Sequence, residues 1–491
     1  MDKYKRFPVF LTATLLLLAS CSEWITTEPR HAISDERALE DMSGIEGAVI
    51  GMYDILQIGS YYGRDMFVAG EMLADNAQLA IANSGRFRDH SVNAIGSGFG
   101  EDVAVWTSAY RIINSANLIF DFLPRVPDGT PARVNQAMGE AHFMRGLAYF
   151  DLLRIFARNP NFPVGAPLGV IHRTAAFRGV DAAAFGVRST IEEGYLLVES
   201  DLLAAERLLS PTAGFPNLAT KMAAQALLAR FYLYWGKWDQ AILWADRARA
   251  SWTARTGAGP WLAPPANYRN VFAVAPGIES IWELRYETAE AQNVNNSLQG
   301  ILVMTDPGNA GYGDVVFRAD LLAAIEPGDV RGTIGVGTAG PHMIQRFTKA
   351  GELVHFTLKF AGYRGAVYHD DIPLIRTSEV QLTLAEALAH PGPSQDLARS
   401  KQVLDELRAA RGLTPSPHTT NPALLDAIIR ERRVELMFEG HRWFDLARLG
   451  REVNKPGGIG SNLPWNDFRT VMRIPLAERD NNPNLIQNPG Y

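Results

Sequence analysis

The chain has 491 residues, of which 47% are hydrophobic, and a formal net charge of −6 at pH 7. This mildly acidic balance, without any run of Lys and Arg, argues against nucleic acid as a partner. A chain of this length can bury a large core. It contains a single cysteine, so disulfides within the chain and cysteine-based metal sites are excluded.

Residues 1–20 have the features of a lipoprotein signal peptide. A basic start is followed by an apolar stretch over residues 8–18, which at about 11 residues is too short to span the ~30 Å apolar layer of a bilayer. The tetrapeptide Leu18-Ala19-Ser20-Cys21 predicts cleavage before Cys21 and acylation of that cysteine. The alternative is an ordinary secretory signal with an incidental cysteine.

The mature chain is therefore predicted to begin at Cys21, anchored by its lipid to the outer membrane. Residues 21–33 contain Pro29 and lack a helical period, which predicts an extended tether of at most about 35 Å. No later stretch is long and apolar enough to cross a membrane, so we expect a protein attached to the membrane and not passing through it.

Helical periodicity dominates residues 34–256. Ser34 is predicted to cap the first helix, and a second helix is predicted over residues 103–120. The first apolar stripe consists of Leu39, Met42, Ile45, Val49, Met52 and Leu56. Residues 140–154 carry two apolar stripes on different faces, which predicts a helix packed between neighbours.

The clearest local signature resembles a tetratricopeptide helical pair. A helix over residues 221–235 is followed by Gly236 for the tight turn, by Trp238 for the space between the helices, and by Ala241 and Ala248 for their close approach. Weaker candidates are the helix over residues 190–209 with the segment before it, and residues 380–389 with residues 398–411. About four such pairs are expected.

Residues 257–376 have a different character. Gly and Pro become frequent, short strands are predicted at residues 280–284 and 353–360, and helix is scarce apart from residues 319–325. Irregular regions of this length usually carry function. Helix returns from residue 377, and the last long helix is predicted over residues 421–449.

The predicted fold is mainly α, with tetratricopeptide-like pairs as scaffold, a large loop-rich region and a few short strands. We expect one domain over residues 34–491. Its predicted parts are a helical part (34–256), a loop-rich insertion (257–376) and a second helical part (377–491).

Glu431, Glu435 and Glu439 recur every fourth residue among arginines and are the most conspicuous charged motif. Two of them could form the acid–base pair of a glycosidase. However, the neighbouring arginines are expected to keep their pKa values low, whereas a proton donor needs a raised pKa. We therefore predict a structural ion network, in which Arg442 pairs with Asp445.

Other catalytic and metal motifs are absent from the sequence. It has no Gly-x-Ser-x-Gly elbow, His-Glu-x-x-His or phosphate-binding loop. His369, Asp370 and Asp371 form a possible metal site, but adjacent acids in a loop are more often solvated. The prediction is that the chain has no catalytic residue, no metal and no cofactor.

A set of segments follows one pattern, in order, over nearly the whole chain. They are Cys21 with residues 27–29 (TEP), residues 140–154 (EAHFMRGLAYFDLLR), residues 224–234 (AQALLARFYLY), Arg376, Glu379 and residues 385–387 (AEA), residues 407–413 (LRAARGL), residues 431–446 (ERRVELMFEGHRWFDL) and residues 474–491 (IPLAERDNNPNLIQNPGY). Together they resemble the SusD/RagB family of surface lipoproteins from Bacteroidetes-type bacteria.

The resemblance implies a function and a partner. Such proteins capture oligosaccharides, or in some cases peptides, at the cell surface and act as the lid of a SusC-like TonB-dependent transporter. It also implies a helical half that faces the transporter, an irregular half that faces the ligand, and no catalysis.

Glycan sites usually combine exposed aromatic rings with amide or arginine donors. Trp106, Trp238 and Trp443 lie on predicted helices and are expected in the core, whereas loop aromatics are better candidates. The resemblance favours residues 86–99 and 286–312, and the absence of tryptophan from the second segment does not favour a starch-like aromatic arc. The predicted ligand-binding residues are Asn76, Arg86, Phe87, Phe99, Trp261, Tyr286, Asn293, Asn296 and Tyr312.

Three alternatives to oligosaccharide capture stay open from the sequence. The first keeps the lid role with peptides as cargo. The second is a surface glycan hydrolase, for which Glu283, Glu287 and Glu290 are the nearest set of carboxylates. The third is a tetratricopeptide scaffold that binds only protein.

Overall fold

The computed structural model describes most of the chain after the predicted tether. The described residues are 34–94, 100–163, 165–179, 185–255, 259–304, 311–364, 367–455 and 462–491. The predicted signal peptide, lipidation site Cys21 and tether, and also Phe99, lie outside this part of the chain.

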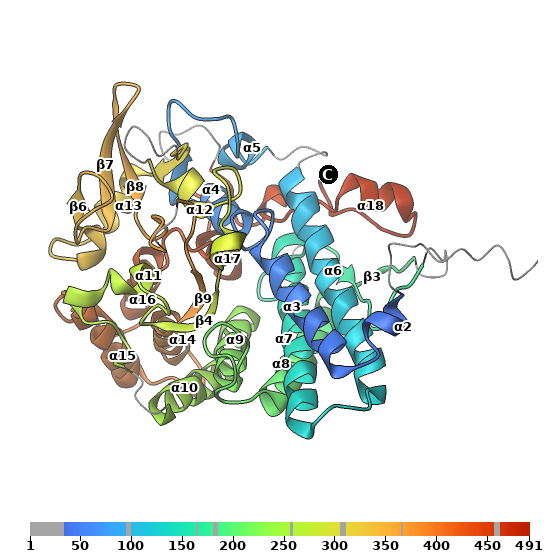
Figure 1. Ribbon diagram of the computed structural model, residues 1–491. Helices are drawn as coiled ribbons and strands as arrows, with labels where there is room; N and C mark the ends of the chain where they lie inside the picture. Colours follow the sequence, from blue (N-terminus) through green and yellow to red (C-terminus); the bar gives the residue numbers. More distant parts are fainter. Residues whose placement is uncertain are drawn as a thin grey trace, which may run out of the picture.

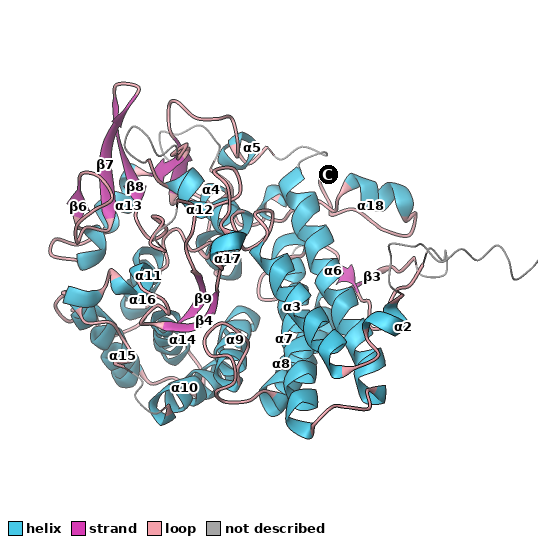
Figure 2. Cartoon of the chain, in the orientation of Figure 1, coloured by secondary structure: helices cyan, strands magenta, loops and turns pink. Residues whose placement is uncertain are grey.

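The structure is mainly helical, as the sequence predicts, and its strands are short (Figure 2). The helices are α2 (Asp35–Ala38), α3 (Met42–Gln57), α4 (Asp65–Met72), α5 (Arg88–Ser91), α6 (Gly100–Phe122), α7 (Pro131–Phe156), α8 (Ile191–Leu208), α9 (Lys221–Trp235), α10 (Trp238–Ala254), α11 (Asn270–Ala273), α12 (Leu298–Leu302), α13 (Ala319–Ala324), α14 (Thr377–Ala389), α15 (Leu397–Ala410), α16 (Ala423–Glu435), α17 (Arg442–Arg448) and α18 (Leu476–Asn481). The strands are β1 (Ala77–Leu79), β2 (Leu168–Ile171), β3 (Arg188–Thr190), β4 (Ser280–Leu284), β5 (Val315–Phe317), β6 (Ile334–Gly335), β7 (Ile344–Lys349), β8 (Glu352–Thr357) and β9 (Ile372–Arg376).

The long helices pack successively along one side of the molecule. α3, α6, α7 and α8 form the right-hand part in Figure 1, and α9, α10, α14 and α15 continue the array towards the lower left. α7 contacts α3, α6 and α8. Phe143 and Leu147 of one stripe and Met144 and Leu152 of the other are all buried. The prediction of a helix between neighbours is confirmed.

The predicted tetratricopeptide-like pair is α9 with α10. Gly236 ends α9 with a left-handed φ of 73°, which glycine adopts without the steric cost of a side chain. Ala241 and Ala248 are fully buried between packed helices. The Trp238 ring stacks on His390, with 3.7 Å between ring centroids, and so joins α10 to the end of α14.

Two helix boundaries differ from the prediction. The first helix is interrupted after α2, and Asp41, not Ser34, caps the long helix α3 by accepting a hydrogen bond from the Gly44 amide at 2.8 Å. The apolar period continues across the break because Leu39 still points into the core, where it is 6% exposed. Hydrophobic spacing alone therefore did not reveal the interruption.

The predicted last helix is also divided, into α16 and α17. Phe438 and Gly440 between them have φ values of 61° and 77°. A Cβ at Gly440 would stand only 2.5 Å from the Met66 carbonyl oxygen, so no other residue fits here without a shift of the backbone. The Gly440 amide donates to Glu71 on α4 at 3.0 Å. The chain is bent here by its close approach to α4.

The loop-rich region lies at the upper left in Figure 1, where short sheets join distant segments. β4 pairs with β9, and β6, β7 and β8 form a three-stranded sheet. β1 pairs antiparallel with β5, with Ala77 opposite Phe317 and Leu79 opposite Val315. This last pairing brings the loop after β1 beside the segment before β5.

The main hydrophobic core connects the helical array to the loop-rich region and extends from Leu39 to Leu485. Trp106, Trp238 and Trp443 all belong to it or pack against it, as predicted. In the described part of the chain, no helix has the length and apolar character needed to cross a membrane.

Candidate functional site

The exposed end of the loop-rich region brings together three segments that are far apart in the sequence. The β1–β5 pairing places Ser84 against Asp314, whose carboxylate accepts from the Ser84 amide at 2.8 Å. The third segment, residues 291–297, is fixed from the side of α3, because Asn296 packs against Gly59 in the turn that follows this helix. The turn is thereby held beside the other two segments.

Arg86, Asn295 and Tyr312 meet where these segments converge, and we call them the Arg86 cluster. The Arg86 Nη2 donates to Asn295 Oδ1 at 2.7 Å, and the Tyr312 hydroxyl donates to the same oxygen at 3.1 Å. The Arg86 guanidinium lies over the Tyr312 ring, with its Cζ 4.9 Å from the centroid. Asn295 is exposed and the other two are half-buried, so the cluster presents polar donors and an aromatic ring at the surface.

The Asn295 side of the cluster is held in place by surrounding groups. Arg64 donates to the Asn295 carbonyl oxygen, and its own charge is paired with Asp65 at 2.6 Å. Asn293 Oδ1 accepts from the Asn295 amide at 2.9 Å, a side-chain turn typical of asparagine. These contacts position the amide group of Asn295 before any ligand arrives.

The Tyr312 side is held in the same way. The Tyr312 amide donates to the Gly300 carbonyl oxygen at 2.6 Å, which ties the segment to α12. Lys349, at the end of β7, donates to the carbonyl oxygens of Tyr312 and Gly313, the second at 2.8 Å. Burial lowers the pKa of Lys349, and the charge of Asp314 acts against this shift.

A small pocket lies on the same side of the loop-rich region. Tyr368, one of its lining residues, is half-buried, and burial together with the nearby Tyr312 raises the pKa of its hydroxyl. The pocket is lined by Gly63, Tyr286, Gln292, Ser297, Leu298, Tyr368, Asp370 and Ile372. The pocket therefore adds the Tyr368 ring and the Gln292 amide close to the Arg86 cluster.

Several residues predicted from the sequence to contact ligand are instead anchors of their own loops. Asn76 is 1% exposed, donates to Glu71 at 2.7 Å and accepts from Arg433 at 2.8 Å. Phe87 is 2% exposed. Tyr286 is also 2% exposed, and its hydroxyl donates to the Gln57 carbonyl oxygen at 2.8 Å. None of the three presents its side chain to a ligand at the surface.

The structure brings together only part of the predicted set. Trp261 is half-buried against Trp252, and its indole donates to Gln381 at 2.8 Å, in the helical array. Arg86, Asn293, Asn296 and Tyr312 do converge. Asn295 is at their centre but was not among the predicted contacts, and the run of asparagines around it was the one signal in the sequence.

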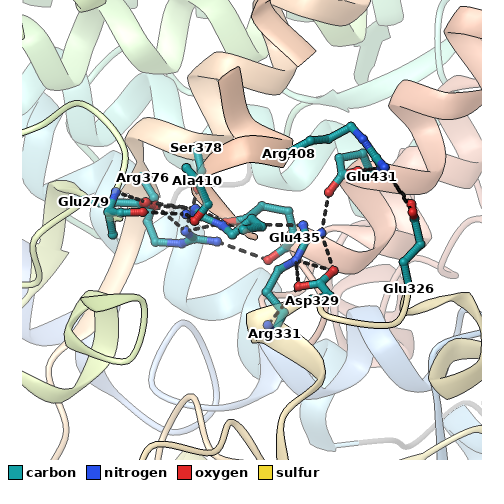
Figure 3. Close-up of polar contacts among 12 residues, drawn as sticks. Glu279, Glu326, Asp329, Arg331, Arg376, Ser378, Arg408, Ala410, Glu431 and Glu435 are labelled. Carbon is teal, nitrogen blue, oxygen red and sulfur yellow. Dashed lines mark hydrogen bonds and ion pairs between the residues drawn. The ribbon is translucent and has the colours of Figure 1, made fainter. Parts of the chain in front are cut away.

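The charged motif near the C-terminus forms a buried ion network, shown in Figure 3. The Glu435 carboxylate contacts Arg331 at 3.1 Å, Arg376 at 3.0 Å and Arg411 at 2.8 Å. Glu279 joins Arg376 to Arg411 from the other side. All five side chains are at most 1% exposed.

Glu431 and Glu439 extend this network at its two ends. Glu431 accepts from Arg331 and from Arg408, the latter at 2.9 Å. Glu439 pairs with Arg376 at 2.7 Å and with Lys359. The network therefore links α16 and α15 to the loop-rich region. This is the arrangement expected of a structural ion network and leaves no carboxyl group free to act on a substrate.

The cause of the low pKa values differs from the prediction. Burial alone would raise the pKa of Glu435, but the charges of Arg411 and Arg376, followed by that of Arg331, outweigh it and hold the pKa well below its usual value. These arginines come from distant segments and not from the sequence neighbours of Glu435. Sequence neighbours on a helix point in other directions.

The neighbouring arginines have partners of their own. Arg432 pairs with Asp445 at 2.8 Å, and Arg433 pairs with Asp320 at 2.7 Å. The predicted pair of Arg442 with Asp445 is wrong, because Arg442 pairs with Asp75 of the segment after α4 at 2.6 Å. The local sequence indicated the glutamates of the network but not the arginines that pair with Glu435.

The carboxylates considered for hydrolysis serve the backbone. Glu283 is 1% exposed and accepts from the Gly277 amide at 3.2 Å; burial raises its pKa to about 7. Glu290 accepts from the Glu287 amide at 2.7 Å in a short turn. Asp370 is not solvated as predicted, because it accepts from the amides of Gly362 and Tyr363. The described residues contain no cluster of metal-ligating side chains.

Comparison with known proteins gives family matches at both ends of the chain. Residues 329–491 match the model of the SusD family, and residues 28–233 match a model described as starch-binding associating with outer membrane. The SusD-like protein P38 of Formosa agariphila is 25% identical over the full length of both chains.

Solved structures share the fold over most of the chain. A SusD superfamily protein from Bacteroides vulgatus has a TM-score of 0.80 and 26% identity, and the match covers 92% of this chain and 99% of the other. A laminarin-binding SusD-like protein has a TM-score of 0.72 and 22% identity over 92% of this chain and all of the other. The chain belongs to the SusD/RagB family, whose members are non-catalytic binding proteins associated with the outer membrane.

Proposed function

We propose that the protein captures oligosaccharides at the Arg86 cluster and delivers them to a SusC-like TonB-dependent transporter of the outer membrane, as its lid. The observation that supports this best is the convergence of Arg86, Asn295 and Tyr312 at an exposed end of the loop-rich region. Each comes from a different segment, and each is held by hydrogen bonds to its surroundings.

The chemistry of these groups suits a sugar. A sugar ring has apolar C–H faces that stack on aromatic rings, and hydroxyls that need fixed donors and acceptors. Tyr312 supplies the ring, the Asn295 amide nitrogen and the Arg86 guanidinium supply donors, and the hydroxyl of Tyr312 can also accept. Because these groups are held before binding, less conformational entropy is lost when a ligand orders them.

The membrane attachment and the transporter partner are proposed from the family and from the sequence. Acylation of Cys21 would hold the body at the outer membrane through the tether of residues 21–33. A lid needs one surface for its transporter and another for cargo, and the division between the helical array and the loop-rich region provides two different surfaces (Figure 2). Names of relatives that mention starch or laminarin support glycans as the cargo.

Calorimetric titration of the full-length chain in detergent, with a panel of neutral glycans, acidic glycans and peptides, tests the cargo. We expect saturable glycan binding without release of product. Tyr312→Ala should weaken the binding about 3- to 10-fold through the loss of one aromatic contact. Phe177→Ala, which removes a 45% exposed aromatic ring from the helical half, is the matched control and should not change it.

Four outcomes would contradict the proposal. Binding of peptides alone would show that the cargo is a peptide and not a glycan. Release of shortened glycans would show that the protein is an enzyme. The lid role is tested by purifying the protein from outer membranes extracted with detergent. If no TonB-dependent transporter is purified with it, the lid role is contradicted. Loss of glycan binding in Phe177→Ala but not in Tyr312→Ala would move the site away from the Arg86 cluster.

A further inference from the structure

Arg86 has no acidic partner among the described residues, unlike the neighbouring Arg64. Arg64 is paired with Asp65, and Lys349 donates to two carbonyl oxygens close to Asp314. Arg86, by contrast, contacts only neutral acceptors, the Asn295 amide oxygen at 2.7 Å and the Ser84 hydroxyl at 3.4 Å. Among the described residues, none places a carboxylate oxygen within 4.0 Å of its nitrogens.

The guanidinium also keeps most of its hydrogen-bonding capacity. Of its five N–H donors, two bond to described residues, and the other three make no hydrogen bond within the described part of the chain. Stacking on Tyr312 and the bond to Asn295 fix its plane, which reduces the rotamer entropy that a flexible arginine would lose on binding. A fixed, planar and unpaired guanidinium matches the two oxygens of a carboxylate or sulfate group.

Neither Asp314 nor Asp65, the two carboxylates near Arg86, contacts it directly. Asp314 is fully buried and accepts from the amide and hydroxyl of Ser84. Ser84 therefore lies between Asp314 and Arg86 in the chain of hydrogen bonds. Asp65 is 1% exposed and contacts Arg64. An anion that reached Arg86 from solvent would therefore meet a guanidinium before it met either of these carboxylates.

From this charge balance we infer that the site selects acidic glycans, whose uronate carboxylate or sulfate ester binds Arg86 while the sugar ring contacts Tyr312 and Asn295. The inference rests on the proposed function, since it names the class of glycan that the same site would take. A neutral sugar would leave the charge of Arg86 without a partner, whereas an acidic sugar would pair it.

The test is calorimetric titration of the full-length chain in detergent with charged and uncharged pairs of the same backbone. Polygalacturonate is compared with its methyl ester, and dextran sulfate with dextran, so that the two arms separate carboxylate from sulfate recognition. At least one acidic member should bind about 10-fold or more tightly than its neutral partner, and the difference should shrink at high salt. Arg86→Ala should remove that difference.

Variants distinguish a specific contact from general attraction. Arg88→Ala removes the same charge from an exposed neighbour and should change affinity less than about 2-fold. Arg86→Lys keeps the charge but not the planar fork, and should recover only part of the binding. Equal losses in Arg86→Ala and Arg88→Ala would overturn the inference.

The remaining outcomes separate this inference from the function on which it rests. Equal affinity for the charged and neutral members, with loss in Tyr312→Ala, would overturn the acidic preference and leave glycan capture standing. Preference for polyglutamate over every glycan would overturn the inference in favour of an acidic peptide. If no glycan of either kind bound, the proposed function itself would fall.

Discussion

The molecule contains two arginine-centred polar clusters that differ in burial and in charge balance. In the ion network, Arg331, Arg376 and Arg411 are almost fully buried, and each contacts more than one carboxylate. In the Arg86 cluster the arginine is half-buried, and among the described residues its hydrogen bonds go to neutral oxygens. The comparison teaches that the number of arginines does not identify a site; what matters is whether their charges are already compensated.

The same comparison explains why the conspicuous motif is not catalytic. The partners of a buried ion pair stay together because an unpaired charge in a medium of low polarity has a high free energy. Glu435 cannot take up a proton easily while three arginines contact it, so it has neither the raised pKa nor the freedom of a general acid. The network connects the helices to the loops that carry the Arg86 cluster.

The largest expected effect is on stability, from Glu435→Gln. The substitution leaves three buried arginines without a shared carboxylate, and should lower the free energy of unfolding by about 3–5 kcal/mol, measured by urea denaturation. Glu326→Gln is the matched control, because that side chain is 52% exposed at the edge of the network, and should cost no more than about 1 kcal/mol. If both substitutions lowered the free energy of unfolding equally, buried and exposed ion pairs would not differ in their contribution to stability.

Arg86→Ala should show the opposite pattern to Glu435→Gln. We expect the affinity for the acidic glycan to fall about 10-fold or more, because a charged hydrogen-bonding partner is lost. The free energy of unfolding should change by less than about 0.5 kcal/mol, since the residue lies at the surface. A large loss of stability would mean that Arg86 is structural, like the arginines of the network.

Glu140→Gln tests a buried carboxyl group that has no ion pair among the described residues. Glu140 accepts from Tyr53 at 3.0 Å and from Gln136 at 2.6 Å, and burial raises its pKa to about 7 from an ordinary value of 4.5. The folded state therefore holds a proton that the unfolded state releases between these values, and its stability falls as the pH rises through this window.

The glutamine variant lacks this ionisation. Between pH 4.5 and pH 8, the free energy of unfolding of the variant minus that of the original chain should therefore rise by about 1–3 kcal/mol. Urea denaturation at the two pH values measures the change. A constant difference between the two chains across this range would show that Glu140 ionises as easily in the folded state as in the unfolded state.

The smallest effect is expected from Tyr286→Phe. It removes a buried hydroxyl that donates to the Gln57 carbonyl oxygen and should cost about 1 kcal/mol of stability. Glycan affinity should stay unchanged, because Tyr286 anchors its loop beneath the surface. A clear fall in affinity with intact stability would restore Tyr286 to the ligand site.

The fold could be predicted from the sequence where a periodic pattern is repeated over many residues. The two stripes of α7 and the Gly236 turn between α9 and α10 are local signals of this kind. The interruption at Asp41 and the bend at Gly440 were missed because they depend on close approaches to other parts of the chain. Helix boundaries of this type leave the hydrophobic period unchanged.

The site was harder to predict because it is assembled from distant segments. Arg86 and Asn295 are 209 residues apart, and Glu435 is 104 residues from Arg331. Phe87 and Tyr286 were predicted to contact ligand because they lie in irregular loop segments, but side-chain direction within a loop is set by tertiary contacts, and both are buried. The sequence therefore indicated the loops of the site, although not which side chains reach the surface.

Hydrogen–deuterium exchange, with and without the tightest-binding glycan of the panel, locates the bound ligand on the protein without any substitution. We predict slower exchange of the amides in residues 291–297 and 311–314, and unchanged exchange in α9 and α10. Protection confined to the helical array, with none in these two segments, would contradict the assignment of the Arg86 cluster as the glycan site.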